Sequence, residues 1–161
     1  MWVSIGVVWG GHHTISSCWF LQPKLITVNK LKDIVLVIQY AVIINAFTDS
    51  QQAVLSDIVG DALDTQGLII GVSTYEAGIF PLIEYAAIIL TRKVASEKPV
   101  LILTSYGWGR VAGKKLANVL ASAGFRITDV VEFRGFPTAA DEAKLRKAAN
   151  KLAHELSART T

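Results

Sequence analysis

Two short stretches of the sequence combine hydroxyl, aromatic and glycine residues, a set suited to holding a flat ligand. The first is Ser73, Thr74, Tyr75, Glu76, Ala77 and Gly78, and the second is Ser105, Tyr106, Gly107, Trp108 and Gly109. A conjugated ring needs backbone N–H groups near its polar edge and an aromatic or apolar face to stack on. Glycines let the backbone come within contact distance of such a ring. Both stretches are therefore candidates for the lining of one binding cleft.

A purely structural interpretation competes with this one. Serine and threonine are common where a strand turns into a helix, so Ser73, Thr74 and Ser105 could do no more than cap helices. Large aromatic side chains at the tips of turns have little core in which to be buried. Since Tyr75, Tyr106 and Trp108 lie at two such turns and are expected to be exposed, the two turns together favour a binding function.

The elements that carry these stretches alternate between strand and helix from residue 67 onward. Apolar runs rich in β-branched residues predict strands at 67–72, 99–105 and 126–135, the last with the weaker alternation of a sheet edge. Helical spacing, proline near a first turn and glycine after a last turn predict helices at 79–96, 108–125 and 138–156. This order is typical of a doubly wound α/β domain with a parallel sheet.

Ligands of such sheets bind beyond the carboxyl ends of the strands, where the strand order reverses. Residues 73–78 directly follow the predicted strand 67–72, and residues 105–109 follow the predicted strand 99–105. Carboxyl ends of parallel strands lie along one edge of a sheet. We therefore expect the two stretches to face one cleft.

The front of the chain has a different composition. Residues 1–33 hold three of the four tryptophans, two of the three histidines and the single cysteine, without a sustained helical period. The composition changes near residue 33. After this change, residues 35–45 are predicted to form a strand and residues 48–66 a loop and a short helix. We predict a single domain, with an atypical segment at 1–33, containing strand 1 and an irregular loop, and the remaining elements at 34–161.

Composition and charge exclude several classes of protein. The formal charge of +3 is spread too thinly for a nucleic-acid interface, which would need a basic stripe interleaved with aromatic residues. The apolar run 34–47 is shorter than the roughly 20 residues that span a bilayer. Cys18 is alone, which excludes an internal disulfide and fits a reducing cytoplasmic compartment. Lys114 and Lys115 are expected at a solvated helix surface, where a basic rim would favour an acidic redox partner.

Residues 46–157 resemble the flavodoxin-like domain of A-type flavoproteins, also called flavodiiron proteins. The resemblance is carried by STYEAGIFP at 73–81 and SYGWG at 105–109, with matching sequence between and after them. It implies a three-layer fold with a five-stranded parallel sheet in the order 2-1-3-4-5, and non-covalently bound flavin mononucleotide (FMN). It also implies that 73–78 lies along the isoalloxazine ring and that 105–109 contacts its other side.

Two departures from the family pattern bear on FMN binding. Glu76 and Ala77 stand where the family often has asparagine, and an acid beside the ring would lower the flavin potential. The phosphate group would be held by a Ser/Thr-rich loop at a helix N-terminus. The only candidates are Gly10, Gly11, Thr14, Ser16 and Ser17, with no convincing helix after them. One hypothesis is that residues 1–33 replace the family's original amino-terminal segment.

The histidines do not form the di-iron site that family members use to reduce oxygen or nitric oxide. His12 and His13 are adjacent, are not followed by an ExD pattern, and are more simply loop residues. The chain is therefore predicted to be an electron carrier, or part of an oxidoreductase, without di-iron reductase activity of its own. Its partner would be a redox protein or a di-iron domain on another chain.

Two other functions stay open on the sequence. If the phosphate loop is lost, the chain is a degenerate flavodoxin-like module that acts as an interaction or structural domain. A flavin-dependent quinone or nitro reductase is less favoured, because the sequence lacks a G-x-G-x-x-G dinucleotide fingerprint. The excess of apolar residues also suggests a homodimer.

Overall fold

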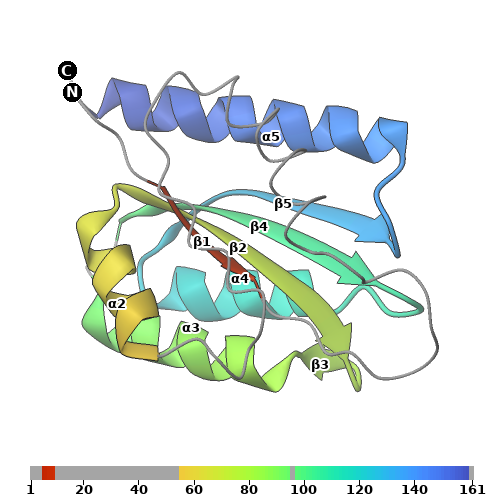
Figure 1. The fold of residues 1–161 in the computed structure, drawn as a ribbon, viewed down its shortest axis with the longest axis horizontal. Coiled ribbons are helices and arrows are strands. Elements are labelled where there is room, and N and C mark those ends of the chain that lie inside the picture. The colour runs from red at the N-terminus through yellow and green to blue at the C-terminus, as the bar shows by residue number, and fades with distance from the viewer. Residues whose placement is uncertain (1–4, 10–54, 95–96, 160–161) are drawn as a thin grey trace.

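A computed structural model describes residues 5–9, 55–94 and 97–159 of the chain (Figure 1). The strands are β1 (Ile5–Trp9), β2 (Gly67–Tyr75), β3 (Gly78–Ile79), β4 (Pro99–Tyr106) and β5 (Arg126–Arg134). The helices are α2 (Leu55–Asp64), α3 (Pro81–Lys93), α4 (Ala112–Ser122) and α5 (Ala139–Ala158). The predicted alternation of strand and helix from residue 67 onward is confirmed.

The sheet is built on four parallel strands in the order β1-β2-β4-β5. The short strand β3 pairs antiparallel with β2 alone. The described residues thus give four parallel strands and not the predicted five, because the strand expected at 35–45 lies outside them. β5 ends the order, as its weaker alternation predicted. The amino-terminal strand predicted within 1–33 is found as β1.

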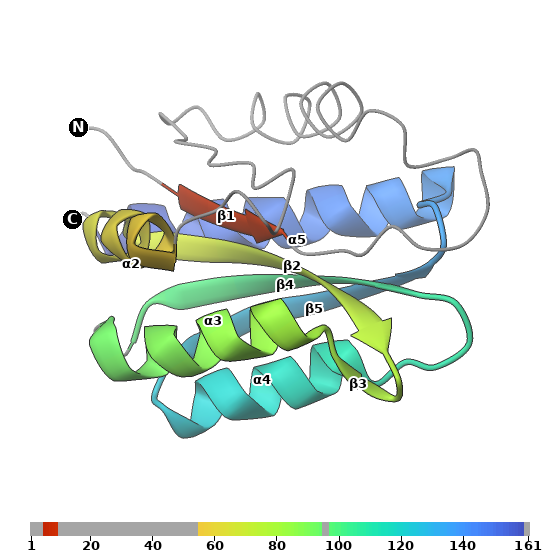
Figure 2. The same ribbon diagram turned by 60° about the horizontal axis from the view of Figure 1, so that its bottom comes forward.

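Helices cover both faces of the sheet, which makes three layers (Figure 2). One core lies between the sheet and α2, α3 and α4, and a second lies between the sheet and α5. Along β4 the side chains alternate, with Val100 and Ile102 in the first core and Leu101 and Leu103 in the second. Burial on both faces explains why this strand reads as an unbroken apolar run.

Local sequence sets the helix ends. Pro81 occupies the first turn of α3, where its missing N–H removes no hydrogen bond. Gly124 follows α4 with φ +91°, a left-handed conformation that glycine adopts without strain. Thr138 caps α5 in a capping box with Asp141. α3 begins at residue 81 and not at 79, because Gly78 and Ile79 pair with β2 instead.

Lys98 fastens α2 to the start of β4. Its Nζ donates hydrogen bonds to the carbonyl oxygens of Ala62 (2.6 Å), Leu63 (2.9 Å) and Thr65 (2.5 Å), at the carboxyl end of α2. Burial lowers the pKa of the Lys98 ammonium, and the carboxylate of Asp64 partly offsets this shift. A cation here also complements the negative end of the helix dipole.

None of the helices in the described part of the chain is long and apolar enough to cross a membrane. The apolar run 34–47 falls outside that part.

Candidate functional site

The two stretches singled out in the sequence lie side by side at the carboxyl edge of the sheet. Ser73 and Ser105 are register partners at the ends of β2 and β4. A Cβ built on Gly109 would lie 3.9 Å from the methyl carbon of Thr74. The expectation that the two stretches share one edge is confirmed, while their role as a ligand site stays a prediction.

The start of α4 ties the two stretches together. The hydroxyl oxygen of Thr74 accepts a hydrogen bond from the backbone N–H of Ala112 at 3.4 Å. A Cβ on Gly113 would lie only 2.5 Å from the hydroxyl oxygen of Thr104, so glycine is what lets this helix approach β4. That hydroxyl is buried and has no hydrogen-bond partner among the described residues. The helix thus starts in close contact with both β2 and β4.

The first stretch is a tight hairpin and not the simple strand-to-helix turn that the sequence suggested. β2 runs through Tyr75 and pairs with Gly78 of β3, leaving Glu76 and Ala77 as the two central residues. Both have positive φ, +44° and +56°. A two-residue hairpin with both centres left-handed is a type I′ turn, which prefers asparagine and glycine. Glutamate and alanine therefore occupy a strained backbone here.

Two contacts support this hairpin. The ammonium of Lys115, on the first turn of α4, donates a hydrogen bond to the carbonyl oxygen of Ala77 at 2.9 Å. The ring of Tyr75 packs edge-to-face against Phe80, with centroids 6.0 Å apart. Tyr75 is nevertheless 45% exposed. The strained turn is thus fixed in place with one face of an aromatic side chain open to solvent.

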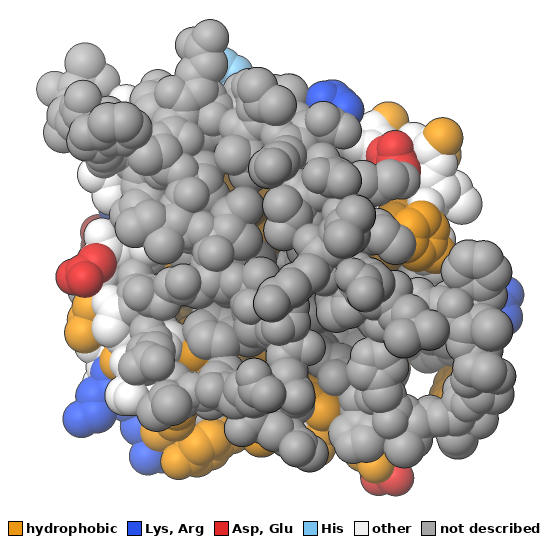
Figure 3. Space-filling view, viewed as in Figure 1, with side chains coloured by type: hydrophobic (Ala, Val, Ile, Leu, Met, Phe, Trp, Pro, Cys, Tyr) orange, Lys and Arg blue, Asp and Glu red, His pale blue; other side chains and the backbone are white. Residues whose placement is uncertain are grey.

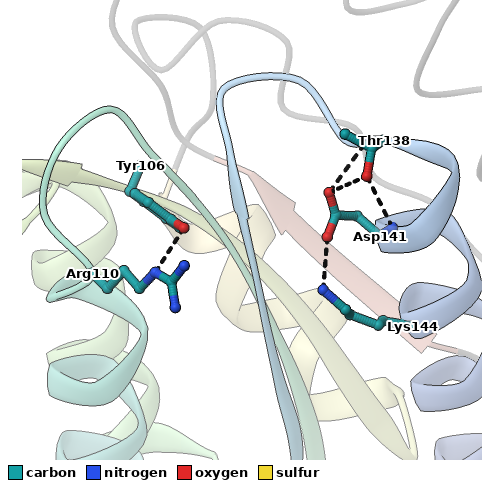
Figure 4. A network of polar contacts seen from close by, with 5 residues as sticks. All are labelled: Tyr106, Arg110, Thr138, Asp141 and Lys144. Atoms are coloured by element: carbon teal, nitrogen blue, oxygen red, sulfur yellow. Dashed lines mark hydrogen bonds and ion pairs between the residues drawn. The ribbon is translucent and has the colours of Figure 1, made fainter.

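The second stretch is fastened by two arginines. The Nε of Arg110 donates a hydrogen bond to the Tyr106 hydroxyl at 2.7 Å, with the guanidinium carbon 5.0 Å from the centre of the same ring (Figure 4). From the end of β5, the Nε of Arg134 donates to the carbonyl of Gly107 at 3.0 Å. The N–H of Gly135 donates to the carbonyl of Tyr106, also at 3.0 Å.

The tip of this stretch points away from the protein. The Trp108 side chain is 95% exposed, and a Cβ built on Gly107 would meet nothing within 4 Å. Packing within the described residues therefore explains neither the large indole nor the missing side chain beside it. An exposed indole and open space at a glycine suit a surface that receives another molecule.

No family profile and no curated protein matches the sequence. Among solved structures, a mutant flavo di-iron protein from Thermotoga maritima is 28% identical over 95% of this chain and 35% of its own, with a TM-score of 0.75. The flavodiiron core of Flv1 from Synechocystis sp. PCC6803 is 18% identical over 98% and 36%, also at 0.75. An archaeal flavodoxin is 14% identical over 96% and 99%, at 0.70.

The chain is a flavodoxin-like domain of the kind found in flavodiiron proteins. It spans about a third of the length of the flavodiiron proteins it matches. The archaeal flavodoxin, by contrast, is matched over nearly its full length.

Side chains that the sequence had not nominated also gather at this edge of the flavodoxin-like domain. Arg110, Lys115 and Arg134 bond to the two stretches. The exposed Phe136 follows Gly135, whose N–H donates to the carbonyl of Tyr106. Arg134 and Phe136 follow β5, whose carboxyl end reaches the same edge as β2 and β4, so the parallel-strand rule could have found them. Arg110 and Lys115 carried no such signal, since helix-surface cations are common.

The described residues contain no group of three or more His, Cys, Asp or Glu side chains that could hold a metal ion. His154 is exposed on α5. Other residues considered in the sequence lie outside the described part of the chain: His12, His13, Cys18 and the phosphate-loop candidates at 10–17.

Proposed function

We propose that the flavodoxin-like domain binds FMN without a covalent bond and serves as an electron-transfer module. The observation that carries the proposal is the pairing of two turns, 73–78 and 105–109, at one edge of the sheet, with Tyr75 and Trp108 exposed and Tyr106 only partly exposed. The flavodiiron and flavodoxin neighbours support the choice of a flavin over other flat ligands.

The residues of the two turns fit a flavin ring in shape. Tyr75 and Trp108 offer exposed aromatic faces, and stacking on such faces suits a conjugated ring. Gly107 leaves open space beside its backbone, so a ring can approach the peptide groups closely. The arginine contacts to Tyr106 and Gly107 hold this turn before a ligand arrives, which reduces the entropy lost on binding.

The polar groups fit the ring edge. Ser73, Thr74 and Ser105 are partly exposed, and their hydroxyls, with nearby N–H groups, can donate to ring oxygens and nitrogens. Bound FMN would supply the redox chemistry, accepting and passing on electrons. The ammonium of Lys115 at the hairpin would favour negative charge on the ring, whereas the carboxylate of Glu76 would disfavour it. No side chain of the domain need act as acid, base or nucleophile.

The proposal extends to parts that lie outside the described residues. Strand 35–45 would complete a five-stranded parallel sheet in the order 2-1-3-4-5, and the 10–17 loop would receive the phosphate. The electron acceptor would be a partner redox protein or a di-iron domain, as the names of the flavodiiron neighbours suggest. The compartment would be the cytoplasm.

A flavin titration tests the proposal. Purified protein is titrated with FMN while flavin fluorescence quenching and absorbance are followed, for the wild type and for Tyr75→Ala and Trp108→Ala. We expect a dissociation constant in the micromolar range or tighter. Each aromatic truncation should weaken binding about tenfold, because a stacked pair contributes roughly 0.5–1.5 kcal/mol beyond its buried area.

Tyr85→Ala is the matched control, since Tyr85 is another exposed tyrosine but lies on the outer side of α3. Its FMN affinity should equal that of the wild type. Absence of FMN binding by the wild type would reject the proposal and favour the alternative, a module that keeps the fold and acts through its surface.

A further inference from the structure

Strand β5 ends the order of the sheet, so one of its edges faces away from β4 (Figure 1). Among the described residues no strand pairs with this outer edge. The middle of the strand, ITDVVEF at 127–133, is rich in residues that favour strands. An edge of this kind is a template on which the strand of another molecule can pair. The outer edge of β5 would therefore add strands unless side chains of the protein close it.

A β-bulge interrupts the register of β5 near its start. Consecutive residues of β4 pair with Ile127 and Asp129, so Thr128 is an extra residue without a register partner in β4. Bulges bend and twist an edge strand, which makes it a poorer template for a further strand. The carbonyl oxygen of Thr128 accepts a hydrogen bond from the ammonium of Lys151 on α5. A helix side chain thus occupies the backbone acceptor of the bulged residue.

The backbone donor that follows the bulge on the outer edge is occupied as well. The N–H of Gly135 donates to the carbonyl of Tyr106 and so points toward β4. Alternate residues of a strand direct their N–H groups to the same side, so the N–H of Val130 points away from β4. It donates to Oδ1 of Asp129, an exposed residue, at 2.8 Å. An N–H that is bonded to this carboxylate is not free to donate to a carbonyl of another strand.

Charge repulsion does little to keep two β5 edges apart. The formal net charge of the chain is only +3, and side chains of both signs appear around the rim of the molecule in Figure 3. The strand itself, RITDVVEFR, carries two arginines and two acids and therefore has no net charge. Segments without net charge or proline and with high β-propensity are those that stack on their own copies. Closure of this edge therefore depends on local contacts.

We infer that Asp129 and Lys151 close the outer edge of β5, and that the molecule they keep out is a second copy of this chain, paired strand to strand. Asp129 withholds a donor and Lys151 withholds an acceptor, on either side of the bulge. Loss of either side chain opens one backbone group to another strand. Strand addition at an edge does not close on itself, so the result is open-ended assembly. The inference does not depend on flavin binding.

Dynamic light scattering of the full chain over a wide concentration range tests the closure of the edge. Asp129→Ala frees the N–H of Val130, and it should lower the concentration at which large assemblies appear by about tenfold, since one more backbone hydrogen bond becomes available at each contact. Lys151→Met frees the Thr128 carbonyl and should act in the same direction by itself. Circular dichroism verifies that each variant keeps its fold.

Asp129→Asn is the matched control, because asparagine removes the same charge but keeps a side-chain oxygen that can accept from the Val130 N–H. It should assemble at the same concentration as the wild type. Glu84→Ala, which removes an exposed acid of α3, controls for the change in net charge and should also match the wild type.

Amide hydrogen exchange locates the contact within the assemblies. In those of Asp129→Ala, the outward-facing amides of Val130, Glu132 and Arg134 should gain protection. Protection gained on another surface, or variants of Asp129 and Lys151 that both keep the wild-type size at every concentration, would overturn the inference. Equal assembly by Asp129→Asn and Asp129→Ala would assign the effect to the lost charge and reject the hydrogen bond as the closing contact.

Discussion

At the scale of single residues, the hairpin at Glu76 and Ala77 is the feature that internal packing explains least. Two non-glycine residues with positive φ occupy adjacent positions, held by the bond from Lys115 to the Ala77 carbonyl. Each left-handed non-glycine residue costs about 1–2 kcal/mol. Strain of this kind clusters at ligand-binding sites. Asparagine would carry less strain here, since it tolerates the left-handed region better than glutamate or alanine.

This strain leads to a stability prediction. Ala77→Gly should raise the free energy of unfolding by about 0.5–1 kcal/mol, because relief of a left-handed alanine outweighs the greater chain entropy of glycine in the unfolded state. Urea denaturation followed by circular dichroism measures the change.

Ala143→Gly provides the matched control. Ala143 lies exposed within α5, where glycine should instead lower the free energy of unfolding by about 1 kcal/mol. Equal losses at both positions would mean that the hairpin carries no backbone strain.

At the scale of elements, α5 depends on the capping box at its first turn (Figure 4). The Thr138 hydroxyl donates to the Asp141 carboxylate at 2.7 Å, and the Thr138 N–H donates to the same carboxylate oxygen at 3.1 Å. Lys144 pairs with the other oxygen at 2.9 Å. The pKa of Asp141 is lowered to about 2, mainly by the hydrogen bond from the Thr138 hydroxyl and next by the hydrogen bond from Lys144.

The lowered pKa of Asp141 predicts how α5 responds to acid. The folded state favours the carboxylate, so its contribution is fully present above the ordinary pKa of 3.8 and is lost as the pH falls toward about 2. At neutral pH the free energy of unfolding should therefore be higher for the wild type than for Asp141→Asn. This difference should shrink as the pH falls from 3.8 toward about 2. Urea denaturation at several pH values measures it.

Thr138→Ala serves as the companion variant, because loss of the hydroxyl donor should raise the pKa of Asp141 and move the acid transition to higher pH. A wild-type to Asp141→Asn difference that is constant with pH would contradict this account of the cap.

Sequence patterns correctly predicted the elements that are buried on both faces or that have clear local signals at their ends. The strand predicted at 99–105 is Pro99–Tyr106, and the helix predicted at 138–156 is Ala139–Ala158. The helix predicted from 108 begins only at Ala112, and the loop before it is held at its start by contacts from Arg134 to Gly107 and from Gly135 to Tyr106. Those contacts join residues far apart in the chain, and no local pattern reports them.

The candidate site was predictable in the same uneven way. The edge shared by Ser73 and Ser105 followed from parallel topology alone. The β2–β3 hairpin did not, because Glu-Ala is a poor sequence for a type I′ turn and only the Lys115 bond and the pairing with Gly78 reveal it.

At the scale of the whole molecule, β1 covers one edge of β2, a strand buried along most of its length. β2 pairs with β4 on one side and with β1 on the other, in parallel register from Ile5 with Gly67 to Trp9 with Gly71. Leu68, Ile69 and Ile70 of β2 are almost completely buried. Removal of β1 would leave an apolar strand with unpaired backbone groups, which is a template for aggregation.

Deletion of residues 1–9 should therefore make the protein aggregate and lower its unfolding midpoint, measured by light scattering and by urea denaturation. Aggregation is expected to continue beyond small oligomers, because a free strand edge adds copies without closing. Deletion of residues 160–161, which follow α5, is the control and should leave both quantities unchanged. If the shortened chain kept the wild-type hydrodynamic size and unfolding midpoint, β1 would contribute nothing to the stability of the sheet.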